Sequence, residues 1–126
     1  MTNSRAKGAR GELEFAKLLT AAGHPAERGV QHAGGVESPD VRCSSMPGVH
    51  WEVKRMKDNC MSAPAAVADW RAQAERDAGG KKIAVIAHRW NNGPWWCGLC
   101  LPGLPVIWLR ADAFLAAPLS IIERLT

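Results

Sequence analysis

A chain of 126 residues is long enough for one compact domain with its own core and too short for two. Its composition is 47% hydrophobic and 22% charged, with no apolar run long enough to span a bilayer, which excludes a disordered or membrane-embedded class. Sixteen Lys and Arg against twelve Asp and Glu give a net charge of +4, which suits a polyanionic partner without requiring one.

Hydrophobic periodicity and turn residues predict helices and strands in alternation. In chain order we expect a helix over 4–22, strands over 26–30, 40–43 and 49–55, a helix over 63–78, strands over 83–87 and 95–101, and short helices after residue 110. Prolines at 102 and 105 interrupt the chain before 106–109. This order predicts a single α/β domain over residues 1–126, a sandwich with a central mixed sheet.

Two of the expected boundaries have a clear chemical basis. Ser62 is expected to cap the second helix, with Pro64 in the first turn, and Gly79 is expected to end it. A loop over 32–38 contains two glycines, which leave it free to approach a ligand.

The segment 49–55 alternates with the period of a strand. Val49, Trp51 and Val53 share one face, which we expect to join the core. The other face carries His50, Glu52 and Lys54 and is expected to be charged, with a surface ion network on a half-exposed strand as the alternative to a functional site.

The charged face is the first candidate for chemistry. Glu52 and Lys54 are two residues apart, so their side chains project from one face roughly 7 Å apart, close enough to act on one phosphate. Asp40 follows Pro39 at the start of the preceding strand, where antiparallel pairing would bring its carboxylate beside Glu52. Two adjacent carboxylates repel unless a cation lies between them, and Mg²⁺ prefers such oxygen ligands. Lys54 would orient the attacking water or neutralise charge in the transition state.

The first helix adds a further acid. Glu12 lies in the same helical sector as Phe15 and Leu19, so its carboxylate should face inward and needs a partner. Glu14 falls on the polar side with Lys17, where we expect a solvated surface charge.

These residues form a known pattern. Pro39-Asp40, eleven residues, and then Glu52-Val53-Lys54 resembles the PD-(D/E)xK nuclease superfamily. The opening Lys7-Gly8-Ala9-Arg10-Gly11-Glu12 and the segment from Arg28 to Asp40 are similar to archaeal-type and phage Holliday-junction resolvases. The resemblance covers about half of the chain.

This resemblance implies a restriction-endonuclease-like α/β/α sandwich and an endonuclease that hydrolyses DNA. It implies a homodimer that nicks opposed strands of a four-way junction or other branched DNA, in a bacterial or phage-infected cytoplasm, with no membrane involved. Mg²⁺, which Mn²⁺ can replace, would be held by Asp40, Glu52 and the backbone carbonyl of Val53. The implied catalytic residues are Glu12, Asp40, Glu52 and Lys54.

Other residues are candidates for contact with nucleic acid. A basic set could follow the DNA backbone, or could simply keep the protein soluble: Lys7, Arg10, Arg28, Arg55 and Lys57. Gln73 occupies a place where related nucleases often carry a polar residue facing the site, although a solvated helix glutamine is the simpler hypothesis.

Three alternatives stay open from the sequence. The chain could be a general or repair-type nicking nuclease, or a catalytically silent DNA-binding module of the same fold, although pure binding needs no paired acids. Cys97 and Cys100 have the spacing of zinc ligands, but the other two cysteines form no second pair, so free buried thiols are the simpler hypothesis. His50 shows no metal-pair spacing with another histidine and is left out of the site.

Overall fold

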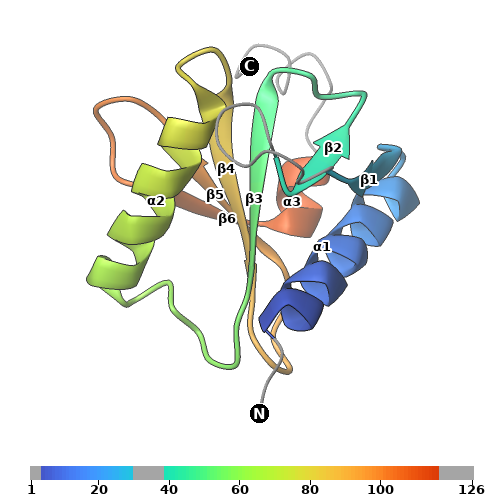
Figure 1. The fold of residues 1–126 in the computed structure, drawn as a ribbon, viewed down its shortest axis with the longest axis horizontal. Helices are drawn as coiled ribbons and strands as arrows, with labels where there is room; N and C mark the ends of the chain where they lie inside the picture. The colour runs from blue at the N-terminus through green and yellow to red at the C-terminus, as the bar shows by residue number, and fades with distance from the viewer. Residues whose placement is uncertain (1–3, 30–38, 117–126) are drawn as a thin grey trace.

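The computed structural model describes residues 4–29 and 39–116, with side chains from residue 8 onward. In these residues six strands lie side by side in the order in which they occur in the sequence (Figure 1). The strands are β1 (Ala26–Arg28), β2 (Val41–Cys43), β3 (Val49–Arg55), β4 (Ile83–Arg89), β5 (Trp96–Cys100) and β6 (Ile107–Arg110). The helices are α1 (Ser4–Ala21), α2 (Pro64–Ala78) and α3 (Ala111–Leu115). The sheet is mixed, because β3 and β4 pair in parallel and all other neighbours are antiparallel.

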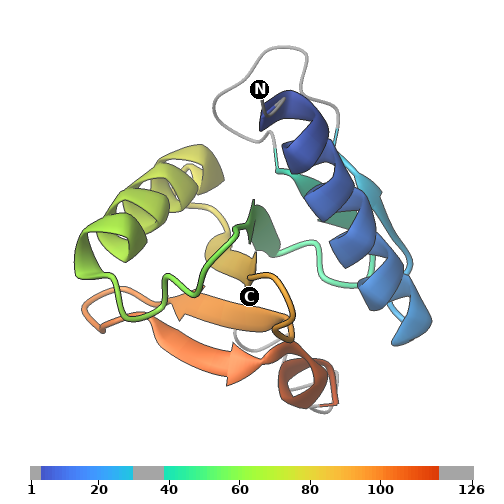
Figure 2. The ribbon, with the colours of Figure 1, turned by 90° about the horizontal axis from the view of Figure 1, so that it is seen from below.

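Helices cover both faces of this sheet, with α1 and α2 on opposite sides of β3 (Figure 2). On one face Phe15 of α1 lies 5.1 Å from Trp51, ring centre to ring centre, and Phe114 of α3 meets the same tryptophan edge-on. On the other face Ala74 of α2 packs against Ile86 of β4. Burying Phe15 and Trp51 completely stabilises the fold by roughly 2–3 kcal/mol each. The predicted α/β sandwich with a central mixed sheet is confirmed.

The ends of α2 test two of the boundary predictions. Gly79 ends the helix with a left-handed φ of 68°, as expected, because only glycine adopts this conformation without strain. The prediction that Ser62 caps the helix was wrong: Ala63 is the N-cap and no side chain caps the helix. Pro64 is the reason, because a proline is favoured at the first helical position and thereby fixes the residue before it as the cap.

The charged face of β3 is buried at His50 and Glu52, which contradicts the alternative of a surface ion network on a half-exposed strand. His50 and Glu52 are as buried as Val49 and Trp51, with 0% and 2% exposure. The crossover helix α2, which joins β3 to the parallel strand β4, lies over this face. The charged side chains therefore lie between the sheet and a helix.

A sixth strand was not expected from the sequence. Residues 107–110 pair with β5, with Gly98 opposite Trp108. A turn in which Leu104 N–H donates to Leu101 C=O reverses the chain between β5 and β6. The expected loop over 32–38 and the tail beyond 116 lie outside the described residues. None of the described helices is both long and apolar enough to cross a membrane.

Candidate active site

Asp40 lies just before β2 and is bound by its backbone and its side chain to β3. Its N–H donates to the carbonyl of Trp51 at 3.0 Å, and its Oδ2 accepts from the N–H of Val53 at 2.8 Å. Val41 pairs with Trp51, so continuing this antiparallel register by one residue sets Asp40 opposite Glu52. This register places Asp40 beside Glu52, as the sequence predicted.

A glycine holds Asp40 from the other side. The N–H of Gly29 donates to the carbonyl of Asp40 at 2.9 Å. A Cβ at this position would lie 1.9 Å from the carbonyl oxygen of Pro39, so only glycine fits here. Sequence reasoning missed Gly29, because it considered only the glycines of the following loop.

Glu12 reaches the same region from α1. Its side chain is 13% exposed, so the inward orientation predicted from the helical sector is confirmed, and Arg28 of β1 donates Nε to its Oε2 at 2.8 Å. Burial raises the pKa of Glu12, Arg28 lowers it, and the charge of Asp40 raises it further. Glu12 and Asp40 are therefore close enough to interact electrostatically.

Glu52 is the most buried of the predicted site residues whose side chains the structure describes. Its pKa is raised above the ordinary value, first by burial; the hydrogen bond from His50 lowers it, and the charge of Asp40 raises it. Lys54 also lowers the pKa of Glu52. The charge of Asp40 thus raises the pKa of both Glu12 in α1 and Glu52 in β3. The three carboxylates therefore lie in one region, together with Lys54.

Lys54 is held in place by α2. Its Nζ donates to Oε1 of Gln73 at 2.9 Å, and Gln73 is partly buried. The simpler hypothesis of a solvated helix glutamine was therefore wrong, and Gln73 faces the site. The hydrogen bond to Gln73 limits the positions that the partly buried Lys54 amine can adopt.

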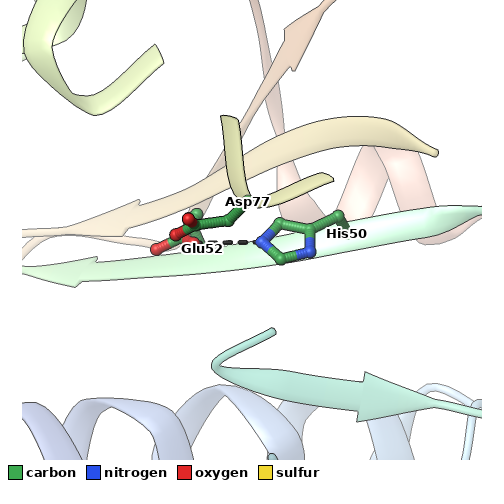
Figure 3. Close-up of side chains that lie close together, drawn as sticks. All are labelled: His50, Glu52 and Asp77. Carbon is green, nitrogen blue, oxygen red and sulfur yellow. Dashed lines mark hydrogen bonds and ion pairs between the residues drawn. The ribbon is translucent and has the colours of Figure 1, made fainter. Parts of the chain in front are cut away.

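One helical turn after Gln73, Asp77 lies beside Glu52 and His50 (Figure 3). Nε2 of His50 is 3.0 Å from Oε1 of Glu52, and one ligand atom from each of the three side chains lies within 4.8 Å of the others. This group could hold a metal ion. Sequence reasoning missed His50 as a site residue and Asp77 altogether. The usable signals were the shared strand face of His50 and Glu52 and the spacing of four between Gln73 and Asp77.

The predicted oxygen donors fit a hard divalent cation. Asp40 and Glu52 each offer a carboxylate, and the N–H and C=O of one strand residue point to the same side of the strand. Because the N–H of Val53 meets Asp40, its carbonyl faces that side too. Two carboxylates and a carbonyl, completed by water, are a set that Mg²⁺ accepts.

The predicted basic set is dispersed in the structure. Arg28 is paired with Glu12, whereas Arg10 and Lys57 are exposed. Arg55 donates to the carbonyl of Met56 at 2.9 Å and to Asn91 at 2.8 Å. The side chain of Lys7 lies outside the described part of the chain.

Glu14 is not the solvated surface charge that the sequence predicted. It is bound by Arg89, and its Oε2 lies 3.8 Å from Nε of Arg55. The two arginines end the neighbouring strands β3 and β4, which bring their charges to the same side of α1. The network therefore ties α1 to the sheet next to the site.

The two cysteines with zinc-ligand spacing lie on opposite faces of β5. Cys97 is in the core with Phe15, whereas Cys100 packs with Ala74 of α2. Strand residues three apart point to opposite faces, so the two thiols do not converge on one ion. Burial raises the pKa of both thiols, that of Cys100 to about 11, and both are free cysteines.

Comparison with known proteins bears on the fold. The chain is similar in structure to Hjc, a Holliday junction resolvase from the archaeal hyperthermophile Archaeoglobus fulgidus. The likeness covers 83% of this chain and 89% of that chain, at 21% sequence identity and a TM-score of 0.50. No protein-family model matches the sequence, and no curated protein does. At this identity the likeness shows the fold, which agrees with the α/β architecture expected from the sequence.

Proposed function

We propose that this chain is a metal-dependent endonuclease that hydrolyses DNA phosphodiester bonds and acts, as a homodimer, on four-way junctions or other branched DNA. The observation that supports this most is the meeting of Asp40, Glu52 and Lys54 at β3, with Asp40 bound to the N–H of Val53 and Lys54 bound to Gln73. The similarity in fold to a Holliday junction resolvase supports the choice of substrate.

Mg²⁺, which Mn²⁺ can replace, is the cofactor that we propose, held by Asp40, Glu52 and the carbonyl of Val53. When bound by these residues, such an ion would supply Lewis-acid chemistry to the phosphate and to the attacking water. The raised pKa of Glu52 fits this role, because a buried carboxylate beside a second acid is stabilised by a cation.

The protein's own groups supply the rest of the chemistry. Lys54, positioned by Gln73, presents a compact positive charge that orients the attacking water and stabilises negative charge on the phosphate. Glu12 lies on the α1 side and holds Arg28 for contact with the DNA backbone. The remaining backbone contacts fall to the other predicted basic residues, Lys7, Arg10, Arg55 and Lys57.

Cleavage of defined DNA substrates tests the proposal. Purified protein is incubated with end-labelled four-way junction, linear duplex and single-stranded DNA, in Mg²⁺ or in EDTA. We expect paired, symmetric nicks in the junction, lost in EDTA and in the Asp40→Asn and Glu52→Gln variants. Asp112→Asn is the matched control, because it removes a carboxylate that is 73% exposed and lies in α3, and it should cut as the parent does.

Other outcomes have distinct meanings. Cutting of every substrate at similar rates would show a general nicking nuclease and would overturn the proposed preference for branched DNA. Binding of junctions without any metal-dependent cutting would overturn the enzyme and leave a DNA-binding module. A mass that corresponds to one chain under cleaving conditions would overturn the homodimer.

A further inference from the structure

A fully buried histidine contacts Glu52 and has no part in the proposed cleavage chemistry. His50 is 0% exposed, and its Nε2 lies 3.0 Å from Oε1 of Glu52. Both residues come from β3, two positions apart, so their side chains leave the strand on the same face, toward α2 (Figure 3).

The hydrogen bonds of His50 determine which ring nitrogen carries its proton. An ionised carboxylate only accepts hydrogen bonds, so Nε2 of His50 is the donor to Glu52. Among the described residues Nδ1 of His50 has no hydrogen-bond partner. A histidine that binds a metal through one ring nitrogen almost always donates the N–H of the other nitrogen to an acceptor. If His50 bound a metal through Nε2, its Nδ1–H would have no acceptor among the described residues. His50 therefore matches a donor to Glu52 better than a metal ligand.

This donor limits what Glu52 can do with its two oxygens. Oε1 is occupied by the His50 N–H, which leaves Oε2 for a cation shared with Asp40. Glu52 is nearly fully buried, so the surrounding side chains restrict its torsions. The last torsion, which sets the direction of the carboxylate plane, is restricted by the hydrogen bond from His50.

We infer that His50 is a positioning residue, whose Nε2–H holds Oε1 of Glu52 so that the other oxygen is directed at the metal ion bound with Asp40. The inference rests on the proposed function, because it assigns His50 a role only through a metal ligand of that site. Asp77 offers the rival arrangement, since it forms no hydrogen bond or ion pair with another described residue and lies beside both side chains. In that arrangement His50, Glu52 and Asp77 together would bind a second cation.

Two substitutions at one position separate the hydrogen bond from the burial of the ring. His50→Leu fills the space but donates nothing, whereas His50→Gln keeps an N–H donor at the position of Nε2. Three quantities are measured for each variant. Calorimetry gives the Mn²⁺ affinity, a cleavage assay at saturating Mn²⁺ gives the rate on the junction, and the thermal midpoint reports on folding. We expect His50→Leu to weaken Mn²⁺ binding about 10- to 100-fold, as the loss of a hydrogen bond to a metal ligand does, and His50→Gln to recover most of it.

A merely structural role would lower the thermal midpoint in both variants without separating their Mn²⁺ affinities, and this result would overturn the inference. Two Mn²⁺ per chain in the parent, with one lost in His50→Gln and in Asp77→Asn, would overturn it in favour of the second cation site. A parent that binds no Mn²⁺ would overturn this inference and the proposed function together. If all variants bind Mn²⁺ with the expected affinities but cleave no DNA, the proposed nuclease activity is overturned. The positioning of Glu52 by His50 would still be supported.

Discussion

The contact between Gly29 and the Pro39–Asp40 backbone gives the sharpest prediction about the site. In Gly29→Ala the new Cβ would lie 1.9 Å from the carbonyl oxygen of Pro39, where real Cβ atoms stay beyond 3.0 Å. The two segments must therefore separate by about 1 Å, because a backbone carbonyl has no flexible end that can move away. This shift acts on Asp40 itself, since Gly29 N–H donates to its carbonyl.

The cost follows from the two interactions that change. Overpacking of a fixed contact costs about 1–3 kcal/mol, and a stretched backbone hydrogen bond costs about 1 kcal/mol. We expect Gly29→Ala to lose about 2–4 kcal/mol in the free energy of unfolding, or about 8–16 °C in the thermal midpoint. A 1 Å displacement of a ligand group also lowers the rate by about 100-fold, so cleavage should fall further than the population of folded protein.

The assay combines urea unfolding with junction cleavage on Gly29→Ala, the parent and Gly8→Ala. Gly8 is the matched control: it lies in α1, a Cβ there would meet nothing within 4 Å, and an alanine stabilises a helix by about 1 kcal/mol relative to glycine. If Gly29→Ala keeps the stability and the cleavage rate of the parent, the close contact does not position Asp40 and the reasoning is refuted.

Two further predictions concern groups that support Lys54. Gln73→Leu removes the acceptor of its Nζ, so we expect cleavage at saturating Mn²⁺ to fall about 10-fold while Mn²⁺ affinity stays unchanged, and a fall in affinity instead would contradict the assignment. His88 accepts the N–H of Cys60 at Nε2, so Nδ1 carries the proton and donates to the carbonyl of Lys54 at 2.8 Å. Burial lowers the pKa of His88 in the folded protein, whereas the unfolded chain protonates it near 6.5. The contribution of the neutral His88 to the free energy of unfolding is therefore fully present above pH 6.5. It declines as the pH falls from 6.5 toward the folded-state pKa of His88, by at most about 1.4 kcal/mol per pH unit. The buried carboxylates with raised pKa act in the opposite direction, so the contribution is measured as the difference in urea unfolding between the parent and His88→Gln from pH 7.5 to 5, and identical slopes would exclude it.

Local patterns predicted the part of the site that lies in one strand. The period of two over residues 49–55 gave the bounds of β3 and the common face of Glu52 and Lys54. Pro39 before Asp40 indicated a strand start, and the short connection to β3 made antiparallel pairing the natural expectation. These features depend on neighbours in sequence, so a single sequence contains them.

The unpredicted features on the Glu52 face of β3 depend on the crossover helix. Whether α2 covers the face of His50 and Glu52 is decided by the parallel pairing of β3 with β4, which no local pattern encodes. Once α2 lies there, Gln73 and Asp77 face the strand one turn apart, and the charged face becomes buried. The resemblance to known nucleases indicated Gln73 but nothing about Asp77.

The balance of charge at the site supports the proposal that DNA and a cation bind there together. Carboxylates of Glu12, Asp40 and Glu52 meet there, with Arg28 beside Glu12 and Lys54 beside Glu52. Without a divalent ion, three carboxylates in one region oppose the approach of a phosphate. A site that only bound DNA would gain nothing from such acids, because each buried carboxylate loses its hydration. The presence of these acids next to a lysine bound by Gln73 therefore supports the proposed site, in which a metal ion would link the carboxylates to the phosphate. In such a site, DNA binding in EDTA would depend on the exposed basic residues.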